Sequence, residues 1–419
     1  MAIDNKDKKV LKSSIEREQN EVACSAECEK IKGSKNLNVP HMRFPEFTEE
    51  WVNVSLKDVA DFQKERISSG LLDESTYIST ENILQNFQGV QSAISIPANT
   101  NVVAYKKNDI LLSNIRPYLK KVWFSDKIGG CSADVFVLRS KTCEPEFLYN
   151  VIASDKFINY VMSGAKGVKM PRGDKNQMES FSFSIPAVAE QRKISRLFQL
   201  LDERIATQNK IIEKLQSLIK GLSQQLLSSE NDWILYRLDD LAQIKSGYSG
   251  TQVSYQTPYK VSRIETISKH CIDIQRIGYV ECIPESYRLN VGNILFSNIN
   301  SIQYIGNTAY LDKDYGLYHG MNLLRIIPNT TIVRPRFLHL LLCTDWAINH
   351  FQTICNKAVS QASINQTALG KSRFPIPPMS VQQQICSMFE LTERKLDNEQ
   401  EYISCLQQQK RYLLQKMFI

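Results

Sequence analysis

The sequence contains the same series of landmarks twice, and this internal repeat constrains the fold more than any other feature. Each landmark of the first half returns about 180–190 residues later, and the separation grows along the chain because the second copy has gained residues between landmarks. The paired landmarks are Trp51-Val-Asn-Val-Ser-Leu-Lys-Asp-Val-Ala with Trp233-Ile-Leu-Tyr-Arg-Leu-Asp-Asp-Leu-Ala, Asp109-Ile-Leu-Leu-Ser-Asn-Ile with Asn293-Ile-Leu-Phe-Ser-Asn-Ile, Pro145-Glu-Phe-Leu with Pro335-Arg-Phe-Leu, and Ser184-Ile-Pro with Pro375-Ile-Pro. The chain therefore consists of two halves of the same design.

Each half has a mixed part followed by a helical part. The mixed part is a series of short segments rich in β-branched and aromatic residues, with one helical stretch at 146–160 or 336–351. After the Ile-Pro segment, Gly and Pro almost disappear, which is typical of a long helix. The sequence predicts an α+β fold with two mixed α/β domains in tandem, each followed by a long helix. The expected boundaries are 1–40 for a flexible N-terminal tail, 41–186 for the first domain, 187–230 for its helix, 231–378 for the second domain and 379–419 for its helix.

The two long helices carry apolar stripes at spacings of three and four residues, close to the period of a coiled-coil seam. Neither helix is apolar all round, so each stripe needs a partner, and we expect the two stripes to pack against each other as a coiled coil. Gln208 interrupts the first stripe, and Thr392, Glu399 and Lys410 interrupt the second. Polar seam positions can fix the register of a helix pair, although such residues can also lie at a solvated edge. The predicted seam positions are Ile194, Leu197, Leu201, Ile205, Ile212, Leu215, Ile219, Leu222, Leu226, Ile385, Met388, Leu396, Ile403, Leu406, Leu413 and Met417.

Composition excludes several classes of protein. Of 419 residues, 42% are hydrophobic and 23% are charged, which is ordinary globular usage. Apolar runs fall far short of the roughly 20 residues of a membrane helix, and no secretory signal is present, so we expect a cytoplasmic protein without membrane contact. We expect its cysteines to be reduced thiols. A formal net charge of +7 permits a polyanionic partner without demanding one.

Motifs for catalysis or for a cofactor are missing from the sequence. Neither a Gly-x-x-x-x-Gly-Lys-Ser/Thr loop nor a Gly-x-Gly-x-x-Gly segment supplies the backbone cradle that a nucleotide needs. Cys24 and Cys28 form a lone pair without a second pair at zinc-ligand spacing, and the histidines follow no metal-ligand pattern. We therefore expect this chain to bind no cofactor and no metal and to have no catalytic residue.

Polar, basic and aromatic residues gather instead on loops that follow the repeated landmarks. Arg and Lys suit phosphates and guanine edges, and Asn suits adenine. Any one such loop is by default an ordinary solvated surface, but recurrence at matched positions in both copies favours a reader of two separated sites on one long polymer. The candidate DNA-binding residues are Ser113, Asn114, Arg116, Tyr118, Lys120, Lys121, Lys166, Lys169, Arg172 and Lys175 in the first copy, and Lys245, Tyr248, Ser297, Asn298, Asn300, Ser360, Gln361, Ser363, Asn365, Gln366 and Lys371 in the second.

Several longer motifs point to a known family. They are Arg43-Phe-Pro-Glu-Phe, Asp109-Ile-Leu-Leu-Ser-Asn-Ile-Arg-Pro, Gly167-Val-Lys-Met-Pro-Arg-Gly-Asp-Lys and Glu190-Gln-Arg-Lys-Ile in the first half, and Gln361-Ala-Ser-Ile-Asn-Gln-Thr, Phe374-Pro-Ile-Pro-Pro-Met and Val381-Gln-Gln-Gln-Ile in the second. With these motifs the chain resembles the DNA-specificity subunit of type I restriction-modification systems, from Arg43 onward. The N-terminal tail is longer than the usual start of that family.

The resemblance implies two target-recognition domains, each reading one half of a bipartite site on double-stranded DNA. It further implies that the two long helices pack as an antiparallel coiled coil and set the spacer between the half-sites. It also implies two modification subunits that use S-adenosylmethionine to methylate adenine, and two restriction subunits that use ATP and Mg for translocation and cleavage. Two alternatives stay open at this point. One is a coiled-coil scaffold that binds only proteins, and the other is a stand-alone DNA methyltransferase or nuclease, whose motifs are missing.

Overall fold

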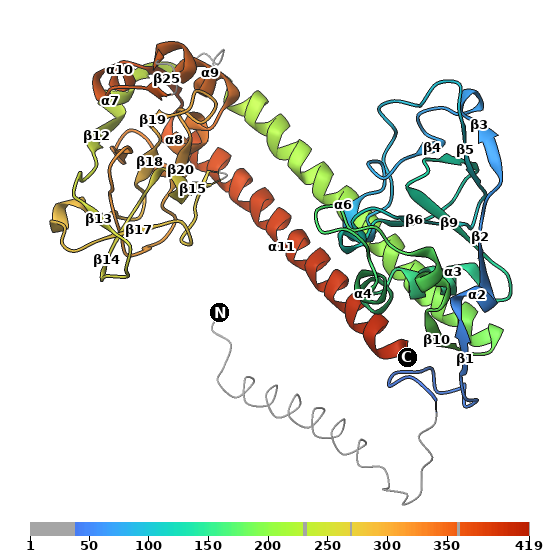
Figure 1. Cartoon of the computed structure of the whole chain (residues 1–419). Coiled ribbons are helices and arrows are strands. Elements are labelled where there is room, and N and C mark those ends of the chain that lie inside the picture. The colour runs from blue at the N-terminus through green and yellow to red at the C-terminus, as the bar shows by residue number, and fades with distance from the viewer. Residues whose placement is uncertain (1–37, 229–232, 269, 358–360, 419) are drawn as a thin grey trace, which may run out of the picture. The chain divides into compact units, whose positions relative to one another are not determined.

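The computed structural model describes residues 38–228, 233–268, 270–357 and 361–418, whose elements are labelled in Figure 1. The chain divides into two compact units, one made of Met1–Asp202 with Gln407–Ile419 and the other of Glu203–Leu406. The division cuts both long helices, so each unit contains one mixed domain and a part of each helix. No helix among the described residues has both the length and the apolar character needed to cross a membrane.

The first domain is built from two four-stranded sheets and an antiparallel pair formed by its first and last strands. One sheet has the order β2-β9-β6-β7 and the other β3-β5-β8-β4, in which only β4 and β8 are parallel neighbours. The strands are β1 (Val52–Ser55), β2 (Ala60–Phe62), β3 (Arg66–Ser68), β4 (Tyr77–Ile78), β5 (Asn101–Tyr105), β6 (Ile110–Ser113), β7 (Val122–Phe124), β8 (Gly129–Cys131), β9 (Val135–Ser140) and β10 (Ser182–Ile185). The helices are α2 (Leu56–Val59), α3 (Pro145–Ile152), α4 (Asp155–Ser163) and α5 (Lys175–Glu179), with short turns η1 (Ser69–Leu71), η2 (Gln85–Phe87) and η3 (Pro117–Leu119).

The second domain repeats the first sheet and the pairing of the end strands, but its second sheet has another strand order: β14 lies inside that sheet, whereas β4, the second strand of the corresponding sheet in the first domain, lies at its edge. Its sheets have the orders β12-β22-β18-β20 and β13-β17-β14-β21, and β11 pairs with β25 as β1 pairs with β10. The strands are β11 (Ile234–Arg237), β12 (Ala242–Ser246), β13 (Gln252–Val253), β14 (Tyr259–Val261), β15 (Ile267–Ser268), β16 (Cys271–Ile272), β17 (Gly278–Val280), β18 (Ile294–Phe296), β19 (Ile299–Asn300), β20 (Thr308–Tyr310), β21 (Leu317–Tyr318), β22 (Leu324–Pro328), β23 (Asn356–Lys357), β24 (Ala362–Ser363) and β25 (Arg373–Ile376). The helices are α7 (Leu238–Leu241), α8 (Pro335–Leu342), α9 (Asp345–Ile354) and α10 (Gln366–Gly370), with turns η4 (Ile264–Thr266) and η5 (Glu285–Tyr287).

The same local signals start the matched helices in both domains. Proline occupies the first turn of α3 and of α8, where its missing N–H is not needed. Ser154 and Thr344 cap the helices that follow them, because each hydroxyl accepts a hydrogen bond from a backbone N–H of the first turn. The repeat seen in the sequence is therefore a repeat of structure.

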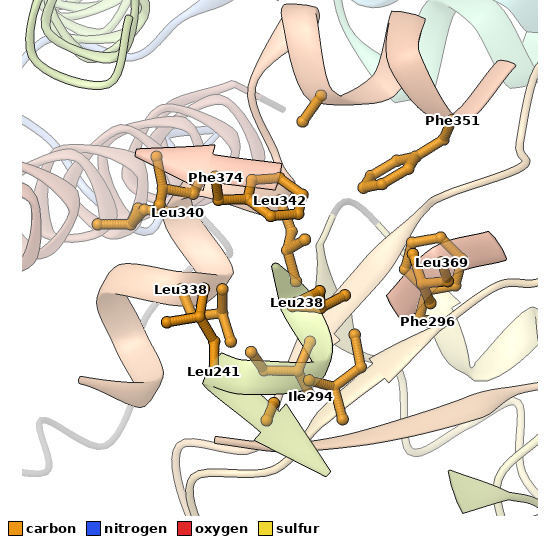
Figure 2. Close-up of a cluster of buried hydrophobic side chains, with 14 of the residues drawn as sticks. Leu238, Leu241, Ile294, Phe296, Leu338, Leu340, Leu342, Phe351, Leu369 and Phe374 are labelled. Carbon is orange, nitrogen blue, oxygen red and sulfur yellow. The ribbon is translucent and has the colours of Figure 1, made fainter. Parts of the chain in front are cut away.

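The cores of the two domains are apolar and lie between the first sheet and the helices. Figure 2 shows part of the core of the second domain, where Leu238 and Leu241 of α7 meet Ile294 of β18 and side chains of α8. Leu56 of α2 and Ile110 of β6 lie in the corresponding core of the first domain. Because all of these side chains are buried, the sheet and helices of each domain form a firm base for the loops that leave them.

The long helices are α6 (Val188–Leu226) and α11 (Met379–Met417). In the unit of the second domain, Gln208 hydrogen-bonds Glu399, and the Arg204 guanidinium lies 5.5 Å from the Tyr402 ring centre. In the unit of the first domain, Lys410 pairs with Asp202 at 2.5 Å. As the residue numbers rise along α6, the residue numbers of their partners fall along α11, so the two helices run antiparallel within each unit.

Burial follows the predicted seam with one exception. The predicted seam residues of α6 are buried or half-buried, and so are those of α11 except Met388, which is 39% exposed. The assignment of Met388 to the seam was therefore wrong, since the neighbouring Phe389 is 2% exposed and belongs to the core of the second domain. Phe389 continues the inward face four residues after Ile385, and Ile219, Leu222 and Leu226 of α6 pack against the same core cluster. Of the predicted tail, positions 1–37 lie outside the described residues, whereas Asn38 donates a hydrogen bond to the Trp51 carbonyl at 2.7 Å.

Candidate nucleic-acid interface

The two candidate loops of the first domain, which lie far apart in the sequence, form one surface. Ile115, just after β6, makes a β-bridge with Arg172. The Arg116 N–H donates to the Pro171 carbonyl at 2.8 Å, and the Gly173 N–H donates to the Asn114 carbonyl at 3.1 Å. We call residues 113–121 and 166–177 together the first loop pair.

The second domain joins its corresponding loops in the same way. Strand β19 pairs with β24, and the Ile364 N–H donates to the Asn298 carbonyl at 2.8 Å. We call residues 297–300 and 361–371 the second loop pair. Ser360, a candidate from the sequence, lies outside the described residues. The pairing recurs at matched positions, so each domain presents one composite loop surface.

The candidate Ser and Asn residues at the start of each loop pair shape the loops from inside. Ser113 and Ser297 are buried; Ser113 donates to the Ile115 carbonyl at 3.0 Å, and Ser297 accepts from the Asn300 amide at 3.1 Å. The side-chain oxygens of Asn114 and Asn298 are buried without a hydrogen-bond partner among the described residues. The side-chain oxygen of the landmark asparagine is therefore buried and, within the described part of the chain, unpaired at the same place in both copies.

Most basic candidates of the first loop pair already have a partner within the domain. Lys120 pairs with Asp155 at 2.5 Å, Lys121 donates to the Thr80 carbonyl at 2.5 Å, Lys166 pairs with Asp174 at 2.7 Å, Arg172 with Asp134 at 3.3 Å and Lys175 with Glu179 at 3.5 Å. The Lys166 ammonium is the main reason that the pKa of Asp174 lies below its ordinary value, and Asp174 also caps α5. These contacts hold the loop pair together.

Arg116 and Lys169 are different, because neither has an ion-pair partner among the described residues and both are exposed. Arg116 has a left-handed backbone, with φ at 51°, where a non-glycine residue is uncommon. Tyr118 is also exposed, two residues further on. Of the candidates in the first loop pair, Arg116, Tyr118 and Lys169 are exposed without an ion-pair partner among the described residues.

The structure adds two residues that sequence reasoning missed. Val168 and Met170 flank Lys169 at the tip of the loop closed by the Lys166–Arg172 bridge, and both are exposed. In the sequence, these two residues could have been noticed as apolar residues within a segment of glycine and basic residues, where an exposed loop is expected. Apolar side chains at an exposed tip can contact thymine methyl groups or the faces of bases.

The second loop pair has fewer free cations. Asn365 caps α10 by accepting from the Ala368 N–H at 2.7 Å, and Gln366 donates to the Ile244 carbonyl at 2.8 Å. Tyr248 packs on Tyr287 with ring centres 5.4 Å apart. The remaining candidates are placed as follows: Gln361 is exposed before β24, Ser363 lies in β24, Asn300 in β19, Lys245 in β12 and Lys371 is exposed after α10. The two domains thus offer different chemistry on the same framework.

One cluster of histidine and cysteine also forms in the second domain. The Cys343 sulfur lies 3.3 Å from His270 Nδ1 and 3.4 Å from His339 Nε2. Arg336 donates to His339 Nδ1 at 2.9 Å, so the proton of the neutral ring is on Nε2. Burial raises the pKa of the Cys343 thiol to about 12. The described residues contain no group of three such side chains suited to a metal ion, and we treat this cluster as part of the core.

Comparisons with known proteins agree on one family. The family model for the type I restriction modification DNA specificity domain matches residues 48–217 and again 230–408. The "Putative type I restriction enzyme MjaX specificity subunit" of Methanocaldococcus jannaschii is 38% identical over 193 residues, a match that spans 45% of this chain and 45% of that relative. The type I restriction enzyme MjaVIII specificity subunit of the same organism is 23% identical over 387 residues, covering 83% of this chain and 87% of that one.

A solved structure shares the fold. The S subunit of a type I restriction-modification system from M. genitalium superposes with a TM-score of 0.58 and 15% sequence identity, over 91% of this chain and 99% of that chain. The two matches to the family model correspond to the two halves that the internal repeat defines.

Proposed function

This chain belongs to the family of type I restriction modification DNA specificity domains, and we propose that it is the specificity subunit of a type I restriction-modification complex. The observation that carries the proposal is the duplicated loop pair. Each domain closes two distant segments into one surface at the same place, through Ile115–Arg172 in the first copy and β19–β24 in the second.

We infer that each domain reads one half of a bipartite DNA target. Available side chains differ between the loop pairs, with Arg116, Tyr118 and Lys169 in the first and mainly neutral amides in the second. Arginine is suited to guanine and amides to adenine, so the two half-sites are expected to differ in sequence. Because the two domains share a framework but carry different loop side chains, we expect a target whose two halves differ in sequence.

The remaining chemistry belongs to partner subunits in this proposal. Two modification subunits supply S-adenosylmethionine-dependent adenine methylation, and two restriction subunits supply ATP- and Mg-dependent translocation and cleavage. This chain contributes recognition, and α6 and α11 set the spacing between half-sites and dock the modification subunits. The complex acts in the cytoplasm, where the host DNA is found.

Methylome sequencing tests the proposal. A host expressing this chain with its modification subunit is compared with a host that expresses the modification subunit alone. We expect new methylation at one motif of two short defined blocks around an undefined spacer. If the assembled complex adds no methylation, and if salt does not weaken its binding to DNA, a protein scaffold replaces the specificity subunit as the explanation.

A further inference from the structure

The second domain contains a cavity of about 390 Å³ next to its loop pair. This volume lies within the range of ligand pockets in proteins. The lining includes Lys245 and Ser246 of β12, Arg325 of β22, Tyr287, and Gln366 at the start of α10. Because Gln366 belongs to the second loop pair, the cavity adjoins the candidate DNA-binding surface.

Two cations face each other across this cavity. Lys245 and Arg325 are direct partners in the antiparallel pairing of β12 with β22, so their side chains leave the same face of the sheet. Like charges opposite each other are destabilising unless a counter-charge is present. Arg325 has no ion pair among the described residues, and the lining contains no carboxylate.

Arg325 is buried as well as unpaired. It is 5% exposed, and its contacts are to neutral oxygens: Nε donates to the Asn293 side chain at 2.7 Å and Nη1 to the Ser286 carbonyl at 3.3 Å. Burial lowers the pKa of this guanidinium below its ordinary value. A buried charge without a partner is costly, so a fold retains it at a cost in stability unless a ligand supplies the missing charge.

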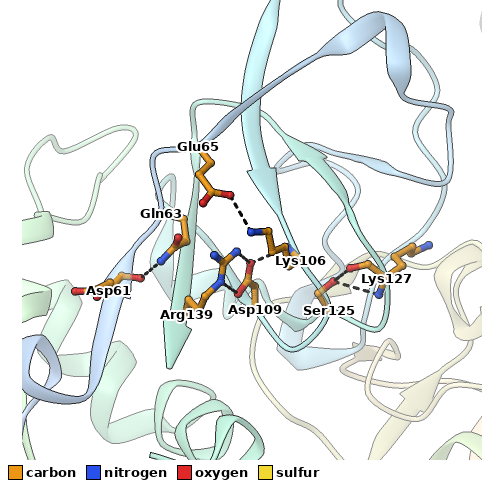
Figure 3. A network of polar contacts seen from close by, with 8 residues as sticks. All are labelled: Asp61, Gln63, Glu65, Lys106, Asp109, Ser125, Lys127 and Arg139. Carbon is orange, nitrogen blue, oxygen red and sulfur yellow. Dashed lines mark hydrogen bonds and ion pairs between the residues drawn. The ribbon is translucent and has the colours of Figure 1, made fainter. Parts of the chain in front are cut away.

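The matched positions of the first domain, all among the described residues, do not form such a cluster of unpaired cations. In its sheet Leu111, the counterpart of Leu295, pairs with Val137, whereas Leu295 pairs with Arg325. Figure 3 shows that Asp109, the buried carboxylate of the first domain, is neutralised by the half-buried Arg139, at 2.7 and 2.8 Å. Asn293 occupies the position of Asp109 in the second domain. At matched positions the second domain has Arg325 in place of Val137 and Lys245 in place of Gln63. It also has Ile327 in place of Arg139, so the carboxylate and its partner are both lost while two other cations lie beside each other.

We propose that this cavity is an anion site that receives a phosphate group of the DNA bound by the second domain. The proposal rests on the function proposed above and adds a contact that the loop pairs do not provide. Arg325 and Lys245 supply the positive charge, and the hydroxyls of Ser246 and Tyr287 can donate hydrogen bonds to phosphate oxygens. Free phosphate offers the same chemistry, so the experiment must separate these two sources.

The test uses the full chain assembled with its modification subunits. Each phosphate of the half-site read by the second domain is replaced in turn by a neutral methylphosphonate, and DNA affinity is measured. One position is expected to weaken binding by about tenfold. Lys245→Gln and Arg325→Val install the residues of the first copy, and each is expected to abolish the penalty at that position. Lys260→Ala, which removes an exposed lysine outside the cavity, is the control and retains it.

A second measurement works without DNA. Inorganic phosphate is expected to raise the thermal midpoint of the wild-type chain above that in chloride of equal ionic strength, and not to do so in Arg325→Val. A phosphate shift with an unchanged methylphosphonate profile in both variants would assign the site to free anion and overturn the DNA assignment. No shift and no change of profile would overturn the site itself. If the wild-type complex binds no DNA, the proposed function fails, while the phosphate shift still decides whether the cavity binds an anion.

Discussion

Gln191 and Gln382 connect the starts of the long helices to the domains through side-chain hydrogen bonds to backbone groups, and replacing them tests how much these bonds stabilise the fold. Gln382 is fully buried in the first turn of α11. Its side-chain oxygen accepts from the Arg334 N–H at 2.8 Å, and its amide donates to the carbonyls of Ile332 at 3.0 Å and Pro377 at 2.9 Å. One side chain thereby links the start of α11 to the start of α8.

Gln382→Leu keeps the size of the side chain but removes these hydrogen bonds. Each buried backbone group left without a partner costs about 1–3 kcal/mol, so three of them give roughly 3–6 kcal/mol after partial rearrangement. Gln191 accepts from the Glu144 N–H at 2.9 Å and donates to the Pro186 carbonyl at 2.8 Å. With two backbone groups affected instead of three, Gln191→Leu should cost less, roughly 2–4 kcal/mol.

Thermal unfolding followed by circular dichroism measures both effects. For a unit of this size, 1 kcal/mol corresponds to about 2–4 °C, so Gln382→Leu should lower a transition by roughly 6–24 °C. The control is Gln383→Leu, on the neighbouring exposed residue, which should stay within about 0.5 kcal/mol of the wild type. Equal midpoints for Gln382→Leu and Gln383→Leu would contradict the reasoning.

Three further predictions concern DNA contact, helix register and pH. The double variant Arg116→Ala with Lys169→Ala should lower the slope of log affinity against log salt by about 0.9 for each lost phosphate contact. The control, Lys64→Ala with Lys156→Ala, changes exposed lysines elsewhere in the first domain and should leave that slope unchanged. Equal slopes for the two double variants would count against the contact. Gln208→Leu with Glu399→Leu removes the polar contact between α6 and α11, so methylome sequencing should then show additional spacer lengths. The control Asn209→Leu, on the exposed face of α6, should keep the single spacer length. A single unchanged spacer in the double variant would contradict the role of this contact in the helix register. Burial lowers the pKa of His319 from 6.5 to about 4, so the unfolded chain binds the proton more tightly and this contribution to stability, complete above about pH 6.5, is lost as the pH falls toward 4. His319→Gln should make pH-dependent urea unfolding less steep in that window, and an unchanged profile would exclude the role of His319.

Periodic and repeated features could be predicted from the sequence. The spacing of Ile194, Ile212 and Leu406 placed them on the inward faces of α6 and α11, because a helix has a fixed local period. The landmarks at Trp51 and Trp233 gave the two domains, since equal sequences fold into equal elements. Met388 shows the limit of this reasoning: after Ile385 a spacing of three leads to Met388 and a spacing of four to Phe389, and only the packing of the core shows that Phe389 is the buried one.

Candidate site residues could be named from the sequence, but their roles could not. Lys120, Lys121 and Arg172 have the residue types of DNA contacts, yet each already has a partner inside the domain, while Arg116 and Lys169 do not. Ion pairs between distant segments depend on where the loops meet, which residue type alone does not specify.

The sequence by itself determined the duplication, the α+β class and the apolar stripes of the two long helices, because these depend on local periodicity and on similarity between the two halves. Only the tertiary structure brought Ile115 beside Arg172 and set Lys245 opposite Arg325. Strand register fixes such neighbours, and register is decided by the packing of the whole sheet and its core rather than by the residues that it brings together.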